Sequence, residues 1–294
     1  MVNNAMYHLT DHLRTALLAA IEAGQSILEI YDRDFIVQYK DDRSPLTVAD
    51  ERSHDIIVAH LSEQTNDKLP ILSEEGQDIP FQERKEWDRF WLVDPLDGTK
   101  EFIKKNGEFT VNIALIQGTR PVLGIIYVPV KDILYFATTG LGAYKSGKRD
   151  LLAMIKDNAT KKEPLGFLNA IIGCSTKLPY HSPHDTFKDS HLTIVGSRSH
   201  STKDLEDFVE DMKKKHRSVE FISAGSSLKL CLVAEGRADI YPRLGPTMEW
   251  DTAAGQVIVE EAHGSVLNSA TNEPLRYNKK NLLNPWFIVR KKPS

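Results

Sequence analysis

The sequence WLVDPLDGTKEF, from Trp91 to Phe102, decides both the fold and the chemistry that we expect of this chain. It begins with an apolar run typical of a buried strand, and the run ends at Asp94-Pro95. Asp97 follows, directly before Gly98-Thr99. Two carboxylates at the end of a strand, with a glycine that lets the backbone approach a ligand, favour a site for a hard cation such as Mg²⁺. A solvated turn that caps a helix is the alternative interpretation of this motif alone.

Further acidic residues occur at the expected ends of strands and starts of helices. Asp50 lies early in a helix that Thr47 can cap, and Glu74 follows a short apolar strand. Asp251 opens a helix whose next residues, 252–255, have small side chains that allow close packing. Helix capping is the alternative interpretation of Asp251, because the helix macrodipole favours a carboxylate in the first turn.

The number of acidic residues matches a pair of divalent cations. Four residues form this set: Glu74, Asp94, Asp97 and Asp251. Two Mg²⁺ ions would neutralise their four negative charges, so a phosphate dianion would enter without net repulsion. Two metal ions roughly 4 Å apart can hold the attacking water and the leaving oxygen of an in-line displacement. Without metal ions, clustered carboxylates repel one another and their pKa values rise.

The predicted elements divide the chain into an α+β half, residues 1–150, and an α/β half, residues 151–294. The first half begins with an amphipathic helix over residues 9–31 and a second helix from Thr47. Three consecutive strands then predict an antiparallel meander: residues 109–116, 122–128 and 133–137. The second half alternates strands at 191–195, 219–222 and 238–241 with helices at 202–216, 226–234 and 249–261.

Two further features belong to the second half, an irregular segment and a last strand. Residues 156–190 contain three prolines and have poor periodicity, which predicts an irregular insertion or long loop at the domain boundary. A last strand over residues 286–289 is expected to close the second sheet.

Composition excludes several classes of protein. The net charge of −4 gives no electrostatic basis for binding bulk nucleic acid. The two cysteines, Cys174 and Cys231, form neither a disulfide framework nor a zinc spacing, and they fit a reducing compartment. The sequence has no signal pattern and no apolar run of bilayer length, so we expect a cytoplasmic protein. The basic runs at 213–215 and 290–292 predict solvated faces; weak attraction to the inner face of an anionic membrane is the minor alternative.

Two motifs, separated by more than 150 residues, carry a family resemblance. With Glu74, residues 94–99 and Trp250-Asp251, the chain resembles the lithium-sensitive, Mg²⁺-dependent phosphatase superfamily typified by inositol monophosphatases. The resemblance extends from the first helix to the last strand. It implies a five-layer αβαβα sandwich with the site between the two halves. It is also the only argument for a homodimer, because the sequence itself leaves the oligomeric state open.

The resemblance assigns roles to individual residues. Asp50 and Thr99 would orient and deprotonate the attacking water, and the backbone amides of Gly98 and Thr99 would hold phosphate oxygens. Asp94 would bridge two ions. The implied ligands of two or three Mg²⁺ ions are Glu74, Asp94, the Leu96 carbonyl, Asp97 and Asp251.

Within the superfamily, the chain is most similar to the branch that removes the 3′-phosphate of adenosine 3′,5′-bisphosphate to give AMP. The segments that carry this similarity are residues 72–75, 97–102, 196–200, 225–229 and 241–243. The branch implies 3′-phosphoadenylyl sulfate as a further substrate. The expected substrate contacts are Glu74, Leu96, Asp97, Gly98, Thr99, Ser199, His200, Gly225, Ser226, Lys229, Arg243 and Asp251.

Three of these contacts distinguish a nucleotide from an inositol phosphate. In the inositol enzymes an acid lies where an alignment on Gly245 places Arg243. Arginine cannot accept hydrogen bonds from sugar hydroxyls, but it binds phosphate with two parallel hydrogen bonds. Lys229, early in a helix, adds a second cation near helix N-terminal donors, and His200 is suited to contact a base or ribose. We therefore expect a second anion beside the phosphate that is cleaved.

Each of these residues has a plainer alternative. Arg243 would pair with a surface carboxylate, Lys229 would be a solvated helix residue, and His200 an ordinary loop residue. Lys100 and Glu101 would form a pair at a helix start without contact to substrate. An inositol or sugar monophosphatase is the alternative function, and a non-catalytic nucleotide- or metal-binding protein is the alternative of another class. The complete acidic set with Thr99 argues against the latter, because a sensor needs no residues that activate water.

Overall fold

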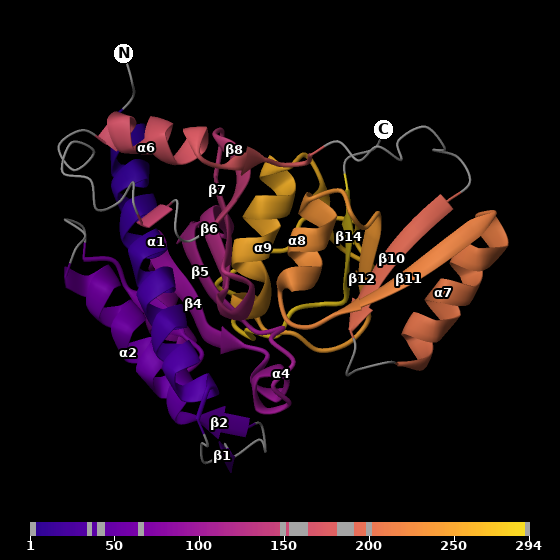
Figure 1. The fold of residues 1–294 in the computed structure, drawn as a ribbon, viewed down its shortest axis with the longest axis horizontal. Helices are drawn as coiled ribbons and strands as arrows, with labels where there is room; N and C mark the ends of the chain where they lie inside the picture. Colours follow the sequence, from indigo (N-terminus) through magenta and orange to yellow (C-terminus); the bar gives the residue numbers. More distant parts are fainter. Residues whose placement is uncertain are drawn as a thin grey trace.

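The structure is a computed structural model, and it forms five layers in which helices alternate with two sheets (Figure 1). The outer layer of α1 (Asn4–Tyr31) and α2 (Val48–Glu63) covers a seven-stranded sheet. Helices α8 (Leu228–Ala234) and α9 (Glu249–Glu261) fill the centre, and α7 (Lys203–Lys215) lies outside a five-stranded sheet. The αβαβα sandwich is therefore confirmed. The structure describes residues 4–33, 37–39, 45–63, 68–147, 151–152, 164–180, 191–197 and 202–291.

The seven-stranded sheet has the order β3-β4-β5-β6-β7-β8-β9. Strands β3 and β4 are parallel, and all other neighbours are antiparallel, so the predicted meander is confirmed as β5–β7. The prediction missed β8, because its two glycines, serine and lysine dilute the apolar pattern. The strands are β3 (Ile71–Ser73), β4 (Arg89–Asp97), β5 (Thr110–Gln117), β6 (Arg120–Val128), β7 (Ile133–Thr138), β8 (Gly142–Gly147) and β9 (Thr176–Lys177).

The five-stranded sheet has the order β11-β10-β12-β14-β13. The predicted last strand is confirmed as β14, shifted by one residue, but it does not form the edge of the sheet, since β13 pairs with its other side. Only two apolar residues, Val266 and Leu267, lie in β13, too few for a recognisable strand pattern. The strands are β10 (His191–Ser197), β11 (Ser218–Ala224), β12 (Ile240–Arg243), β13 (Ser265–Asn268) and β14 (Phe287–Arg290).

The remaining elements are short. Strands β1 and β2 form a small antiparallel pair, and α4 follows β4 directly. Their bounds are β1 (Val37–Tyr39), β2 (Pro45–Thr47), α3 (Phe81–Arg84), α4 (Thr99–Ile103) and the 3₁₀ helix η1 (Pro129–Lys131). Among the described residues, none of the helices combines the length and apolar character that a membrane span requires.

The segment expected to be an irregular insertion contains a helix, α6 (Pro164–Gly173), and strand β9. The prediction counted Pro164 as a breaker, but proline is well tolerated in the first turn of a helix, where its missing N–H loses nothing. Helix α6 packs on α1 through Phe167 and Ile171. Because β9 pairs with β8, the seven-stranded sheet includes residues beyond 150, and a domain boundary there remains a prediction. Residues 156–163 and 181–190 lie outside the described residues.

The central strands of the larger sheet are buried on both faces. In β4, Trp91 and Val93 pack in the core beneath α1 and α2, whereas Phe90 and Leu92 pack in the core around α9. This explains why the run before Asp94 is apolar without alternation, as strands covered on both faces usually are.

Helix α9 lies unusually close to β6, because both partners lack side-chain bulk at the contact. A Cβ atom added to Gly124 would lie 2.4 Å from the Ala254 carbonyl oxygen and 2.9 Å from its Cα. A Cβ atom added to Gly255, on the other side of the helix, would lie 2.5 Å from a Leu230 methyl. The expectation that small residues after Asp251 allow close packing is confirmed. This contact sets the distance between the larger sheet and the helix that carries Asp251.

We predict that Gly124→Ala lowers the free energy of unfolding by about 3 kcal/mol, because the new methyl group overlaps backbone atoms that cannot rotate away. Chemical denaturation measures the change. Gly173→Ala is the control, since a Cβ atom there meets nothing within 4 Å. Equal stability of the two variants would contradict the close packing of α9.

Candidate active site

A β-bulge at Pro95 brings Asp94 and Asp97 to the same face of β4. Asp94 pairs with Asn112 and Asp97 pairs with Thr110, so β4 has one residue more than β5 between these pairs. Residues three apart in a regular strand point to opposite faces, and the extra residue corrects this. Proline suits the bulge because it has no N–H for the ladder. The Ser53 hydroxyl of α2 donates to the Pro95 carbonyl at 2.7 Å and holds the bulge in place.

Three of the predicted ligands converge from three elements. Oxygen atoms of Glu74, after β3, Asp94 and Asp251, in the first turn of α9, lie within 4.8 Å of one another. The Leu96 amide donates to one Asp94 oxygen at 3.1 Å, and the Met248 amide donates to one Asp251 oxygen at 2.9 Å. Asp251 therefore caps its helix and also joins the acidic cluster, so the capping interpretation is confirmed and the role as a metal ligand stays a prediction.

The clustered carboxylates hold their protons unusually strongly. Burial, followed by the charges of Glu74 and Asp97, raises the pKa of Asp94 well above its ordinary value. Burial and the charges of Asp97 and Glu74 raise the pKa of Asp251 to about 8. The pKa of Asp97 is also raised by burial, against the opposing effect of Lys229. These clustered carboxylates lack enough positive charge to balance them, and their oxygen atoms suit a hard divalent cation.

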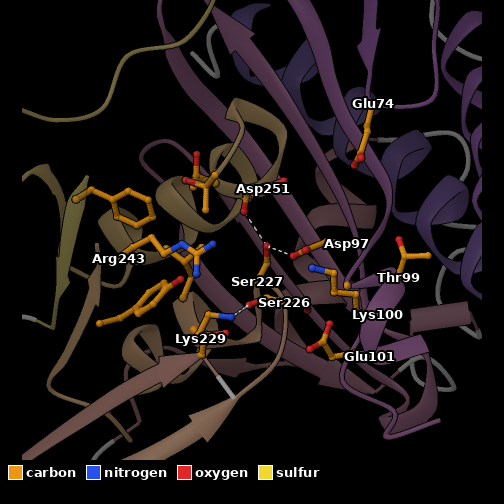
Figure 2. A pocket seen from close by; sticks show the side chains of 17 residues that line it. Glu74, Asp97, Thr99, Lys100, Glu101, Ser226, Ser227, Lys229, Arg243 and Asp251 are labelled. Carbon is orange, nitrogen blue, oxygen red and sulfur yellow. Dashed lines mark hydrogen bonds between the residues drawn. The ribbon is translucent and has the colours of Figure 1, made fainter. Parts of the chain in front are cut away.

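Asp97 lies beside this group with different contacts. It is absent from the set of three that meet within 4.8 Å, and its Oδ2 accepts a hydrogen bond from the Ser227 hydroxyl at 2.7 Å. Figure 2 shows Asp97 and the backbone of Asp251 on either side of Ser227. Asp97 still lines the same cavity as Glu74 and Asp251.

The predicted catalytic pair is in direct contact. The Thr99 hydroxyl, at the first position of α4, donates to Asp50 Oδ1 at 3.1 Å. The other Asp50 oxygen accepts from the Thr47 amide at 2.8 Å and the Thr47 hydroxyl at 2.7 Å. The Ala49 amide donates back to the Thr47 hydroxyl, so the predicted cap is confirmed as a reciprocal capping arrangement. Burial raises the pKa of Asp50, which makes it a stronger base when ionised.

A cavity of about 220 Å³ opens between the two halves of the molecule, and both acidic and basic side chains line it. Glu74, Asp97 and Asp251 line it together with Lys229 and Arg243 (Figure 2). Seen from Glu74, the two cations lie beyond Ser227. Other residues of the wall are Gly98, Thr99, Lys100, Glu101, Ser226, Tyr241 and Phe287.

Lys229 is buried, so the interpretation as a solvated helix residue is wrong. Only 5% of its surface is exposed, and its ammonium group donates to the Ser226 carbonyl at 2.6 Å and the Ala224 carbonyl at 3.4 Å. It also lies over the Tyr241 ring. Burial lowers the pKa of Lys229 to about 8. The protein thus keeps a cation at the cavity wall that no carboxylate contacts directly within the described residues.

Arg243 retains hydrogen-bonding capacity. Its Nη2 donates to the Pro246 carbonyl at 2.6 Å, while its buried Nε has no hydrogen-bond partner among the described residues. No salt bridge joins it to a carboxylate in the described part of the chain. A buried donor without a partner is costly, and an anion in the cavity would supply one.

The remaining predicted contacts have mixed outcomes. Gly98 has a φ of +92° at the start of α4, which glycine adopts without strain, and it lines the cavity with Ser226. The Gly225 amide donates to a Glu108 oxygen, so it is already occupied. Ser199 and His200 lie outside the described residues, and their contacts remain predictions.

Sequence reasoning missed two residues that contact Asp97. Ser227 and Asn112 lie 115 positions apart, and both donate toward the Asp97 carboxylate. Ser227 follows the predicted contact Ser226 directly. Asn112 is the one polar residue inside the apolar run of residues 111–116, and a buried amide in such a run was the available signal.

Comparisons with known proteins show which family and which individual proteins this chain resembles. A model of the inositol monophosphatase family matches residues 8–286. The 3′(2′),5′-bisphosphate nucleotidase CysQ of Salmonella typhimurium strain LT2 is 41% identical over 274 residues, covering 92% of this chain and 96% of that protein. CysQ of Escherichia coli strain K12 is 40% identical with the same coverage. The crystal structure of CysQ from Bacteroides thetaiotaomicron is 48% identical, with a TM-score of 0.82, covering 96% of this chain and 98% of that chain.

We predict that a divalent cation stabilises this protein more as the pH rises. In the folded protein without metal, the pKa of Asp251 is about 8, whereas the ordinary pKa of an aspartate side chain is 3.8. The folded state therefore binds more protons between these values, and its stability falls as pH increases through that window. A cation that replaces the protons offsets this loss.

Thermal unfolding at pH 6 and pH 8, each with a chelator or with excess Mg²⁺, measures the effect. The increase in Tm on adding Mg²⁺ should be larger at pH 8, and Asp251→Asn should reduce the difference. An equal increase at both pH values in the unmodified protein would argue against a charge-deficient cluster.

Proposed function

This chain belongs to the inositol monophosphatase family, and we propose that it is a 3′(2′),5′-bisphosphate nucleotidase, a hydrolase that converts adenosine 3′,5′-bisphosphate to AMP and phosphate. The observation that carries the choice of substrate is the cavity in which Arg243 and Lys229 face the acidic cluster. Identity of about 40% to named nucleotidases over 92% of the chain supports the same assignment.

The family is metal-dependent, and the acidic cluster fits that dependence. We propose that two or three Mg²⁺ ions bind to the carboxylates of Glu74, Asp94, Asp97 and Asp251 and to the Leu96 carbonyl. When bound, Mg²⁺ would neutralise these carboxylates, polarise the phosphate and acidify a water molecule. Competition by Li⁺ for the same oxygen donors would account for inhibition by lithium, which we also propose.

The chain's own residues can remove the proton from the attacking water. The Thr99 hydroxyl donates its hydrogen to Asp50 Oδ1, so the lone pairs of its oxygen can accept a hydrogen bond from water. As the water oxygen bonds to phosphorus and the P–O3′ bond breaks, the water proton passes to Thr99 and the Thr99 proton to Asp50. The leaving 3′-oxygen takes a proton from solvent water to become the ribose hydroxyl, and Asp50 later returns its proton to solvent. Thr47 holds the second Asp50 oxygen and so fixes the direction of this transfer.

A second anion distinguishes this substrate from an inositol monophosphate. The 5′-phosphate of the nucleotide would accept hydrogen bonds from Arg243, whose Nε has no described partner, and would gain from the charge of Lys229. The apolar rings of Tyr241 and Phe287 complete this part of the wall. The sulfated analogue, 3′-phosphoadenylyl sulfate, carries an anion at the same 5′ position, and we propose it as a further substrate.

Cellular context remains a proposal as well. Lys213 and Lys214 pair with Glu210 and Asp211 on α7, at 2.7 and 2.9 Å, which favours a solvated face over membrane attachment. A nucleotide in the cytoplasm is the partner that we propose. A homodimer rests on family resemblance alone.

We predict that Thr99→Val lowers kcat about 10²- to 10⁴-fold, since it removes the hydroxyl that relays the proton while keeping the shape of the side chain. Phosphate release from adenosine 3′,5′-bisphosphate measures the loss. Thr138→Val is the control, because the buried Thr138 hydroxyl has no partner among the described residues. Binding of Mn²⁺ should be unchanged in both variants. Near-normal turnover by Thr99→Val would contradict the proposed proton transfer through Thr99.

We predict that Arg243→Glu lowers kcat/KM for adenosine 3′,5′-bisphosphate at least about 30-fold, because a negative charge replaces a donor to the 5′-phosphate. Turnover of inositol 1-phosphate, which has no second anion, should change far less. Arg290→Glu is the charge-matched control. Arg290 is exposed and lies at the end of β14 opposite to Phe287, the residue that pairs with Arg243. Equal losses on both substrates would refute the anion subsite and favour an inositol or sugar monophosphatase.

A further inference from the structure

A buried amide lies beside the site, near the start of β5. Asn112 is 1% exposed and lies between the apolar residues Val111 and Ile113. Its cross-strand partner is Asp94, and its Nδ2 donates to Ser227 Oγ at 3.0 Å and lies 3.5 Å from Asp97 Oδ2. A polar side chain buried among apolar neighbours costs stability unless its hydrogen bonds are all made, which raises the question of what these bonds achieve.

The hydrogen bonds of Asn112 belong to a directed chain that crosses the two halves of the molecule. The Ser226 hydroxyl donates to Thr110 Oγ1 at 3.1 Å, and the Thr110 hydroxyl donates to Asn112 Oδ1 at 2.9 Å. The amide group of Asn112 then donates to Ser227. Each hydroxyl has a single hydrogen, so the direction of one bond fixes the direction of the next. The chain ends with the Ser227 hydrogen directed away from Asn112.

Two acceptors compete for that hydrogen. Asp97 Oδ2 and the backbone carbonyl of Asp251 each lie 2.7 Å from Ser227 Oγ (Figure 2). Ser227 is 3% exposed, so water does not readily replace either bond. Ser227 therefore links the end of β4 to the first turn of α9, the two elements that carry Asp97 and Asp251. Ser227 and Asn112 both donate to the same Asp97 oxygen, Oδ2, and so restrict the rotation of a carboxylate that lines the cavity.

We propose that Ser227 and Asn112 are positioning residues that hold the Asp97 carboxylate in the orientation needed to bind a divalent cation. This inference rests on the proposed metal-dependent function. Groups that orient metal ligands by hydrogen bonds change metal affinity about 10- to 100-fold when they are removed. Neither residue touches substrate in this role, and both act through Asp97.

Direct titration of the protein with Mn²⁺, by calorimetry and without substrate, tests the inference. Ser227→Ala and Asn112→Ala should each raise the Kd of the affected ion about 10-fold or more. The double variant should show less than the product of the two effects, because both act on one carboxylate. The Mg²⁺ concentration for half-maximal phosphate release should rise in parallel, while the rate at saturating Mg²⁺ falls much less.

Two further variants separate orientation from packing. Ser227→Cys fills similar space but donates weakly, so it should behave like Ser227→Ala. Ser26→Ala removes a buried hydroxyl that donates only to the Ala23 carbonyl in α1, and it should leave Mn²⁺ affinity unchanged. Thermal unfolding in chelator shows which variants fold.

The outcomes distinguish this inference from the proposed function. Unmodified protein that neither binds Mn²⁺ nor releases phosphate would overturn both. Unmodified protein that does both, with Ser227→Ala and Asn112→Ala binding Mn²⁺ as tightly, would overturn the positioning role alone. Independent, multiplicative effects of the two variants would also overturn it, because two separate contacts would then be responsible.

Discussion

The repulsion among clustered carboxylates is the constraint on which the rest of this structure depends. Glu74, Asp94 and Asp251 bring ligand oxygens within 4.8 Å of one another, and Asp97 lines the same cavity. Burial raises the pKa values of Asp94, Asp97 and Asp251, and neighbouring carboxylates raise those of Asp94 and Asp251 further. The charged cluster is therefore unfavourable without a counter-charge. The fold must therefore hold the acidic residues together against their mutual repulsion. Closely packed backbone segments and hydrogen bonds to the backbone provide this restraint.

Each element of the sandwich contributes to that restraint. The bulge at Pro95 turns two carboxylates to one face, and the Ser53 hydroxyl secures it from α2. The glycine contact of β6 sets the position of α9 and hence of Asp251. Ser227 spans the remaining gap between β4 and α9. The unfavourable charge at the site is thus offset by packing elsewhere, as is common at functional sites.

The sequence allowed the elements and the acidic residues to be predicted where a local pattern exists. Helix α9 was predicted over residues 249–261 as observed, because polar and small residues mark its start clearly. Helix α6 was missed because proline was counted as a breaker, and β13 because two apolar residues make no pattern. The contacts of Ser227 with Asn112 and Asp97 join residues 115 and 130 positions apart. No local periodicity encodes such contacts, and only the assembled layers reveal them.

The most direct test of the account is phosphate release by the unmodified protein from adenosine 3′,5′-bisphosphate and, in parallel, from inositol 1-phosphate. Each substrate is assayed with Mg²⁺, with a chelator, and with Mg²⁺ plus Li⁺. We expect strong preference for the nucleotide, no release in chelator and marked inhibition by Li⁺. Preference for inositol 1-phosphate would contradict the role of Arg243 and Lys229, and release that persists in chelator would contradict the metal site itself.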